Sequence, residues 1–164
     1  MSVEFRLAQI DDQAAIIAIY NQAVATKGST ADLTPVTVAQ RQPWFAAFTP
    51  AHFPLWVIES DGEVAGFVGL EPYSDRAGYR QTAEVALYLD DHHQGQHLGT
   101  QAVDFIAQQA PQLGVTTVIS RIFGHNRASR HLFEKAGYAH WGHLPAVAEM
   151  QGFTADLEVY GHHF

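Results

Sequence analysis

The segment Asp90 to Thr100, which reads DDHHQGQHLGT, has the composition of an anion-binding loop. It joins a run of alternating apolar residues to the start of an amphipathic pattern, so it should connect a strand to a helix. Unpaired N–H groups at a helix N-terminus attract anions, and Gly95 and Gly99 would let a pyrophosphate approach the backbone closely. Two glycines that merely turn the chain are the alternative interpretation of this segment.

A carboxylate stands inside the run that precedes this loop. Thr82 to Asp90 alternates, which predicts a β-strand with Ala83, Val85, Leu87 and Leu89 on its apolar face. Glu84 lies on the opposite face. Burying a carboxylate is costly unless it is paired or lines a wet cleft. Glu84 is therefore either a salt-bridged or exposed strand residue or a functional group.

Other kinds of site find less support in the sequence. His93 and His97 are four residues apart, as in zinc-binding helices, but Gly95 lies between them in a loop. No Glu-bearing metalloprotease pattern accompanies them, so no metal is expected. The chain also has no cysteine and no G-x-S-x-G elbow, which argues against a hydrolase with a Cys or Ser nucleophile.

Composition favours one domain that binds a small molecule. The 164 residues, 47% of them hydrophobic, suffice for a single core, so residues 1–164 are expected to form one domain. A formal net charge of -8 works against nucleic acid and favours a neutral or cationic partner. No apolar run is long enough for a membrane helix, and Met1 to Ile10 lacks a signal-peptide pattern. We therefore expect a cytoplasmic protein with neither membrane nor nucleic-acid partners.

The remaining patterns predict a mixed α/β domain. Strands are expected at Val3 to Ala8, Leu55 to Glu59, Val64 to Leu70, Thr82 to Asp90, Val115 to Ile122, Tyr138 to Leu144 and Phe153 to Tyr160. Single residues predict helix caps at Asp11 or Asp12, at Thr37 and at Asn126, a helix interruption at Pro43, and a hairpin turn at Asp61-Gly62. The order β-α-α-β-β-β-α-β-α-β-β argues for a mixed sheet with helices on both faces.

A second motif, GHNRASRHLFEKAGY at Gly124 to Tyr138, follows the loop after one helix and one strand. Together the two segments resemble the GCN5-related N-acetyltransferase (GNAT) superfamily. Its acyl-CoA signature is Gln or Arg, two residues, Gly, one residue, then Gly or Ala, with an Asn-led helix downstream that ends in a LYEKLGF-like phrase. Here Gln94 and Gly99 match the first and last signature positions, and His97 replaces the middle glycine. The phrase is matched by Asn126, Leu132, Glu134, Lys135 and Gly137.

Further segments resemble the phosphinothricin acetyltransferase-like branch of that superfamily. IYNQAV at Ile19 to Val24, PVTV at Pro35 to Val38 and the run Pro72 to Glu84 are similar to that branch. Near the end, Gly152 and Asp156 match a phrase that the branch writes as GRWxD. The resemblance therefore covers nearly the whole chain.

The resemblance implies a GNAT fold in which acetyl-CoA donates an acetyl group to the amine of an amino acid or analogue. Glu84 would remove a proton from the substrate ammonium, and the central strands would splay after Thr82 to Asp90 to admit pantetheine. The residues implied to bind the cofactor are Leu87, Tyr88, Leu89, Gln94, Gly95, Gln96, His97, Leu98, Gly99, Thr100, Asn126 and Ser129. Arg76, Tyr79 and Arg80 are implied to hold an anionic end of the substrate, and the branch commonly forms homodimers.

A proton donor to the leaving thiolate is not evident. Phe133 stands where the branch has His and many family members have Tyr, and it cannot donate a proton. Nearby, His131 is expected to be solvated, Tyr138 to belong to the core and Ser129 to lie early in a helix. Since a CoA thiolate is a good leaving group, a general acid is dispensable here.

Departures from the branch pattern affect the substrate. Ser74 stands where a branch arginine is common and Thr154 replaces the branch tryptophan, so phosphinothricin is predicted to be a poor substrate. Phe133 and His97 also keep open an alternative, a non-catalytic protein that binds or senses acyl-CoA.

Overall fold

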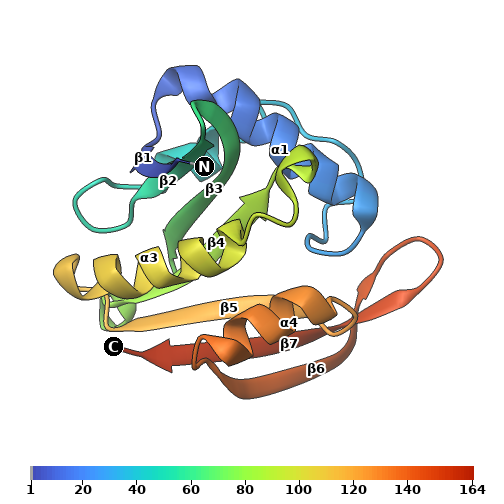
Figure 1. Ribbon diagram of the computed structural model, residues 1–164. Helices are drawn as coiled ribbons and strands as arrows, with labels where there is room; N and C mark the ends of the chain where they lie inside the picture. The colour runs from blue at the N-terminus through green and yellow to red at the C-terminus, as the bar shows by residue number, and fades with distance from the viewer. Residues whose placement is uncertain (1) are drawn as a thin grey trace.

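The computed structural model describes residues 2–164 as a seven-stranded mixed sheet with helices on both faces (Figure 1). The strands are β1 (Val3–Leu7), β2 (Leu55–Ser60), β3 (Glu63–Pro72), β4 (Thr82–Leu89), β5 (Thr117–Phe123), β6 (Ala139–Glu149) and β7 (Thr154–His163), in the spatial order β1-β2-β3-β4-β5-β7-β6. The helices are α1 (Gln13–Thr26), α2 (Gln42–Ala46), α3 (Leu98–Gln112) and α4 (Arg127–Lys135). The expected fold class and element order are confirmed. Within the described residues, no helix is both long enough and apolar enough to cross a membrane.

The sheet separates two apolar layers. α1 and α2 pack on one face, against core residues that include Leu55, Val57 and Phe67. α3 and α4 cover the other face, where Figure 1 shows both helices on the same side of β4 and β5. Because side chains alternate along β4, Ala83 joins the α3 layer whereas Tyr88 packs into the α1 layer. Glu84 shares the face of Tyr88, so its carboxylate points to the α1 side of the sheet.

The Asp61-Gly62 turn joins β2 to β3 as predicted. Both residues have positive φ, 50° at Asp61 and 82° at Gly62, which is the backbone that a two-residue hairpin turn requires. The turn sets the register of β2 against β3. On its other edge β3 pairs with β4, in a register that places Glu71 directly opposite Glu84.

The two central strands diverge within β4 rather than after it. β4 and β5 run parallel and pair at only three positions, the last being Glu84 opposite Ile119. β5 continues along β7 as far as Phe123, while β4 continues along β3. The predicted splay is present, but it begins at Glu84, so residues 85–89 have backbone groups on the β5 side that no strand satisfies.

The start of α1 differs from the predicted Asp cap. Asp12 precedes the helix, but its carboxylate makes no cap hydrogen bond to it. The carboxylate instead receives two hydrogen bonds of 2.8 Å from the guanidinium of Arg6 and one of 2.7 Å from the amide of Gln9. A bidentate, charge-assisted contact to Arg6 is stronger than a neutral cap, which explains the preference.

The second helix is shorter than predicted. Thr37 does form a reciprocal pair of hydrogen bonds with Gln40, at 3.0 and 3.1 Å, but these close a turn that precedes the helix. α2 begins only at Gln42, with Pro43 in its first turn. The expectation that Pro43 interrupts the helix is wrong, because a proline at a helix start lacks an N–H that would have no partner there anyway.

Candidate active site

Two cavities adjoin where β4 and β5 diverge. The first, which we call the Glu84 cavity, has a volume of about 230 Å³, and its polar lining includes Tyr20, Arg41, Trp44, Glu71, Glu84, Ser120 and Arg121. The second, the Gln94 cavity, has a volume of about 320 Å³ and reaches Leu89, Asp91 and Gln94. The cavities share Ser29, Leu87, Tyr88, Asn126, Ser129 and Phe133. A ligand in one cavity can therefore meet a ligand in the other beside β4.

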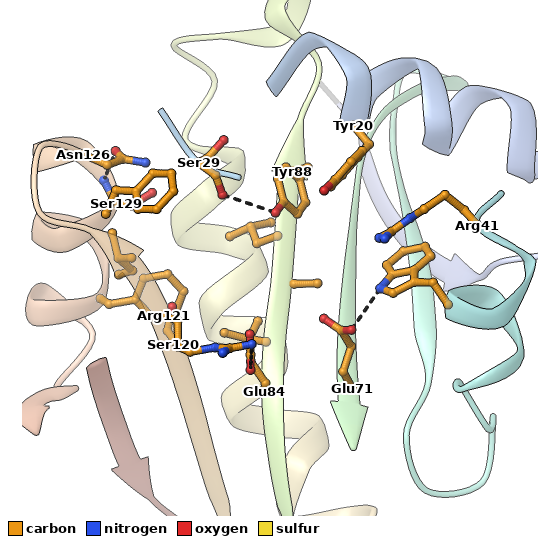
Figure 2. Close-up of a pocket in the computed structure, with 17 residues that line it drawn as sticks. Tyr20, Ser29, Arg41, Glu71, Glu84, Tyr88, Ser120, Arg121, Asn126 and Ser129 are labelled. Carbon is orange, nitrogen blue, oxygen red and sulfur yellow. Dashed lines mark hydrogen bonds and ion pairs between the residues drawn. The ribbon is translucent and has the colours of Figure 1, made fainter. Parts of the chain in front are cut away.

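Glu84 is both salt-bridged and exposed to its cavity. Its Oε1 lies 2.9 Å from Nη2 of Arg121, and its side chain is 19% exposed. Figure 2 shows the two side chains meeting at the base of the cavity, between β4 and β5. Since the guanidinium of Arg121 is itself half-exposed, this ion pair adds little to stability. The two sequence interpretations of Glu84 are thus compatible, because the pair orients a carboxylate that still faces the cavity.

A second carboxylate, Glu71, faces the same cavity and was not predicted from the sequence. It stands opposite Glu84 across the β3–β4 ladder, and its Oε1 accepts a hydrogen bond of 2.9 Å from Nε1 of Trp44. Burial, followed by the negative charge of Glu84, raises the pKa of Glu71 above its usual value of 4.5. The available signal was weak: a single Glu at the end of the apolar run 64–70.

Replacing Glu71 by glutamine should change how stability depends on pH. A carboxyl whose pKa is raised on folding stabilises the protein below its unfolded-state pKa, and this contribution is lost as pH rises through the folded-state pKa. Glutamine keeps the acceptor for Trp44 but never carries the buried charge. We therefore expect the melting temperature of Glu71→Gln, minus that of the parent, to increase between about pH 4 and about pH 8. A difference that stays flat across this range would contradict this electrostatic assignment.

The carboxylate of Asp90 fixes the loop before α3 through hydrogen bonds. The carboxylate of this buried residue accepts hydrogen bonds from the side chain of Gln22 at 2.7 Å, from the amide of His92 at 3.2 Å and from the ring of His93 at 2.8 Å. Burial alone would raise the pKa of Asp90, but the hydrogen bonds from Gln22, His93 and His92 outweigh it and hold the pKa at about 2. The loop thus has a fixed, ionised anchor that ties it to α1.

His97, which stands in place of the middle signature glycine, has a left-handed backbone conformation. It precedes α3 with φ 58° and ψ 26°, in the left-handed region that non-glycine residues seldom adopt, and Gly95 nearby has φ 75°. His97 therefore holds a backbone conformation that a glycine would adopt without strain. Its side chain points into a third cavity, of about 540 Å³, which it lines with Thr100 and with His131 from α4.

The residues predicted to bind the cofactor fall into three groups, one of which, His97 and Thr100, lines the third cavity. Those that line the Gln94 cavity are Leu87, Tyr88, Leu89, Gln94, Asn126 and Ser129. Gly95, Gln96, Leu98 and Gly99 line neither this cavity nor the Glu84 cavity. Leu98 is buried in the core, and a Cβ on Gly99 would lie 3.2 Å from a methyl of Leu132. Leu98 and the two glycines can therefore contribute to a ligand only through their backbone, whereas the side chain of Gln96 accepts a hydrogen bond of 3.2 Å from Ser60.

The predicted substrate anchors lie away from the Glu84 cavity. Arg76, Tyr79 and Arg80 are exposed residues in and around the short 3-10 helix Ala77–Tyr79, and none of them lines the cavity. The guanidinium groups that do line it belong to Arg41 and Arg121. Neither was singled out from the sequence, because α2 and β5 meet at this site only through the fold.

The region of the missing general acid is apolar. Phe133 is buried, lines both cavities and packs edge-on against Tyr138, with ring centroids 4.9 Å apart. Burial raises the pKa of Tyr138, and its hydroxyl has no hydrogen-bond partner within residues 2–164. His131 is exposed, and the amide of Ser129 donates to the capping side chain of Asn126 at 3.1 Å. The core, solvated and early-helix positions expected for these three residues are confirmed.

Comparison with known proteins places the chain in a family. The profile of the Acetyltransferase (GNAT) family matches residues 16–138, and the chain belongs to that family. It is 41% identical over 157 residues to YwnH of Bacillus subtilis, named as a candidate phosphinothricin acetyltransferase, covering 95% of this chain and 96% of that one. It is 32% identical over 158 residues to the L-methionine sulfoximine/L-methionine sulfone acetyltransferase of Pseudomonas aeruginosa, covering 96% and 92%. The predicted superfamily and branch are confirmed, and the chain is an acetyltransferase.

Solved structures agree with this assignment. A crystal structure of a candidate phosphinothricin N-acetyltransferase, 40% identical, superposes with a TM-score of 0.95 over 99% of this chain and 98% of the other. The Salmonella typhimurium protein yncA, a candidate acetyltransferase solved with its cofactor acetyl-CoA, is 27% identical, with a TM-score of 0.91 over 99% and 94%. The GNAT fold is therefore confirmed over essentially the whole chain.

Proposed function

We propose that this protein transfers the acetyl group of acetyl-CoA to the α-amino group of a small amino acid or amino-acid analogue. The observation that carries the proposal is the carboxylate of Glu84 in a cavity that adjoins the Gln94 cavity along the unpaired edge of β4. The Pseudomonas aeruginosa relative is named for amino-acid analogues, which supports the acceptor class, and the yncA structure supports the donor.

The chain offers backbone donors that suit acetyl-CoA. The first i→i−4 hydrogen bond of α3 runs from Gln101 to His97 at 3.1 Å, so the amides of residues 98–100 precede the helical ladder and are free for a pyrophosphate. Beyond Glu84, the edge of β4 that faces β5 has free amides for the pantetheine arm. When bound, acetyl-CoA supplies the acetyl group as a reactive thioester.

Glu84 accepts the proton in this mechanism. It takes a proton from the substrate ammonium, directly or through water, so that the nitrogen lone pair can form a bond to the acetyl carbon. A free β4 amide donates a hydrogen bond to the carbonyl oxygen as negative charge develops there. The carbon–sulfur bond then breaks, and the sulfur departs as a thiolate. Phe133 excludes water from this region but gives no proton, which is consistent with direct release of the thiolate.

A substrate panel tests the proposal. CoA release should be fastest with small amino acids and with methionine sulfone or methionine sulfoximine, and slow with phosphinothricin. Activity confined to polyamines or protein N-termini would contradict the acceptor class, and efficient turnover of phosphinothricin would contradict the second expectation. Tight acetyl-CoA binding with no turnover of any amine would instead support the non-catalytic acyl-CoA sensor, which the inert side chain of Phe133 favours.

We further propose that the protein works as a homodimer in the cytoplasm. β6 lies at the edge of the sheet, and the exposed Trp141, Leu144 and Val147 along it form an apolar surface that a second copy would cover. Light scattering on the purified protein would give the mass of the assembly, and cell fractionation its location. A monomer at micromolar concentration would remove the homodimer from the proposal.

A further inference from the structure

Arg41 is held between two aromatic rings at the mouth of the Glu84 cavity. Its Cζ atom lies 4.8 Å from the centroid of Tyr20 and 4.8 Å from that of Trp44. Figure 2 shows its guanidinium extending from the start of α2 toward the space between Tyr20 and Glu71. Ring faces attract a guanidinium and keep water from it while leaving its edge N–H groups available.

The rings that hold Arg41 are themselves fixed. The hydroxyl of Tyr20 is hydrogen-bonded to Oγ1 of Thr30 at 2.7 Å and also to the carboxylate of Asp32. The indole N–H of Trp44 donates to Glu71, and its ring packs edge-on against Phe67, with centroids 5.8 Å apart. The guanidinium is thus positioned by groups that belong to the core, which limits how far it can swing.

Within residues 2–164 this guanidinium has no ion-pair or hydrogen-bond partner, although Glu71 lies close enough for the two charges to interact. Nothing in residues 2–164 forms an ion pair or a side-chain hydrogen bond with Arg41, and its Nε atom is buried without an acceptor. Buried donors in folded proteins are almost always satisfied, and a buried charge is costly unless it is paired. Arg121, the other guanidinium of the cavity, already pairs with Glu84. Arg41 lines the same cavity but forms no ion pair within the described residues, so its terminal N–H groups remain available to an anion that enters.

We propose that Arg41 binds the α-carboxylate of the acceptor amino acid while the α-amino group lies toward Glu84. This inference rests on the proposed function, since it assigns the second charged end of the same substrate. A planar guanidinium matches a carboxylate with two parallel hydrogen bonds, which fixes orientation as well as affinity. The proposal therefore assigns carboxylate binding to Arg41, at the start of α2, and not to Arg76 and Arg80, which lie outside the cavity.

The test compares Arg41→Met with the parent on two acceptors, the best amino acid of the substrate panel and its carboxamide. The amide keeps the reacting amine and the side chain but has no carboxylate, so it serves as the matched control. For the amino acid, kcat/KM should fall about 10- to 100-fold through KM, because a charge-assisted contact is lost. For the carboxamide it should change by less than about threefold, and the acetyl-CoA dissociation constant should stay the same. Arg41→Lys, which keeps the charge but not the fork, should fall in between.

Each other outcome has a distinct meaning. If the parent acetylates no amino acid, the proposed function fails and the inference fails with it, before any variant is made. If the parent is active but Arg41→Met weakens acid and amide equally, Arg41 only supports Tyr20 and Trp44, and the inference is overturned while the function stands. If Arg76→Met or Arg80→Met abolishes the preference for the acid instead, the anchor returns to the loop. Arg41→Lys carries the same comparison should the methionine variant fold poorly.

Discussion

Glu84→Gln should lower kcat for amine acetylation by about 10²- to 10⁴-fold near neutral pH, with acetyl-CoA binding unchanged. Glutamine has the shape of glutamate and keeps an oxygen for Arg121 at the position that now lies 2.9 Å away, but it cannot accept a proton from an ammonium. The defect should shrink as pH rises, because a growing fraction of the acceptor amine is then already deprotonated. Steady-state kinetics between about pH 6 and about pH 10 would measure both effects.

The matched control is Glu4→Gln, the same change on an exposed strand residue outside the cavity. It should leave kcat and its pH profile as in the parent. If Glu84→Gln kept full kcat with an unaltered profile, the Glu84–Arg121 pair would be structural and the proton would leave by another route. A loss of acetyl-CoA affinity in the same variant would mean that the substitution disturbs β4 rather than proton transfer.

Most of the fold was predictable because its signals are local. The alternation from Thr82 onward, the Asp61-Gly62 turn and the Asn126 cap each depend on a few neighbouring residues, and each is present in the structure. The errors also have local causes. The carboxylate of Asp12 binds Arg6, six residues earlier in the chain, instead of capping α1. Pro43 lies in the first turn of α2, whereas the sequence pattern predicted that the helix begins earlier. Where two nearby partners compete for one side chain, the sequence pattern alone does not show which contact forms.

The residues of the candidate site also differ in whether a local sequence signal marks them. Glu84 and the loop from Gln94 stood out because a carboxylate in an apolar strand and glycines before a helix are unusual within their own segments, and the family resemblance then favoured a functional interpretation of both. Nothing in the neighbouring sequence marks Arg41 or Glu71 as unusual. The β3–β4 register and the packing of α2 on the sheet bring them to Glu84. Arg76 and Arg80 show the reverse case, since proximity in sequence to β4 does not carry their side chains into the cavity.

Gly99→Pro should weaken acetyl-CoA binding by about 10- to 100-fold or more. Proline removes the amide of residue 99, one of the three that precede the helical ladder of α3, and a hydrogen bond to a charged pyrophosphate is worth a factor of that size. Its ring also restricts Leu98, whose side chain is buried in the core. Calorimetry with CoA would give the dissociation constant, and a melting curve would show whether the variant remains folded.

Gly99→Ala separates the loss of the donor from crowding. Alanine keeps the amide and adds only a Cβ, which would lie 3.2 Å from a methyl of Leu132, the flexible end of a side chain that can shift by a few tenths of an ångström. We therefore expect Gly99→Ala to bind CoA within a few-fold of the parent. If both variants lost affinity equally, Gly99 would matter for the packing of α3 on α4 rather than for the pyrophosphate. If neither did, the N-terminus of α3 would no longer be part of the binding site, and the contacts would have to come from β4 and from Asn126 in the Gln94 cavity.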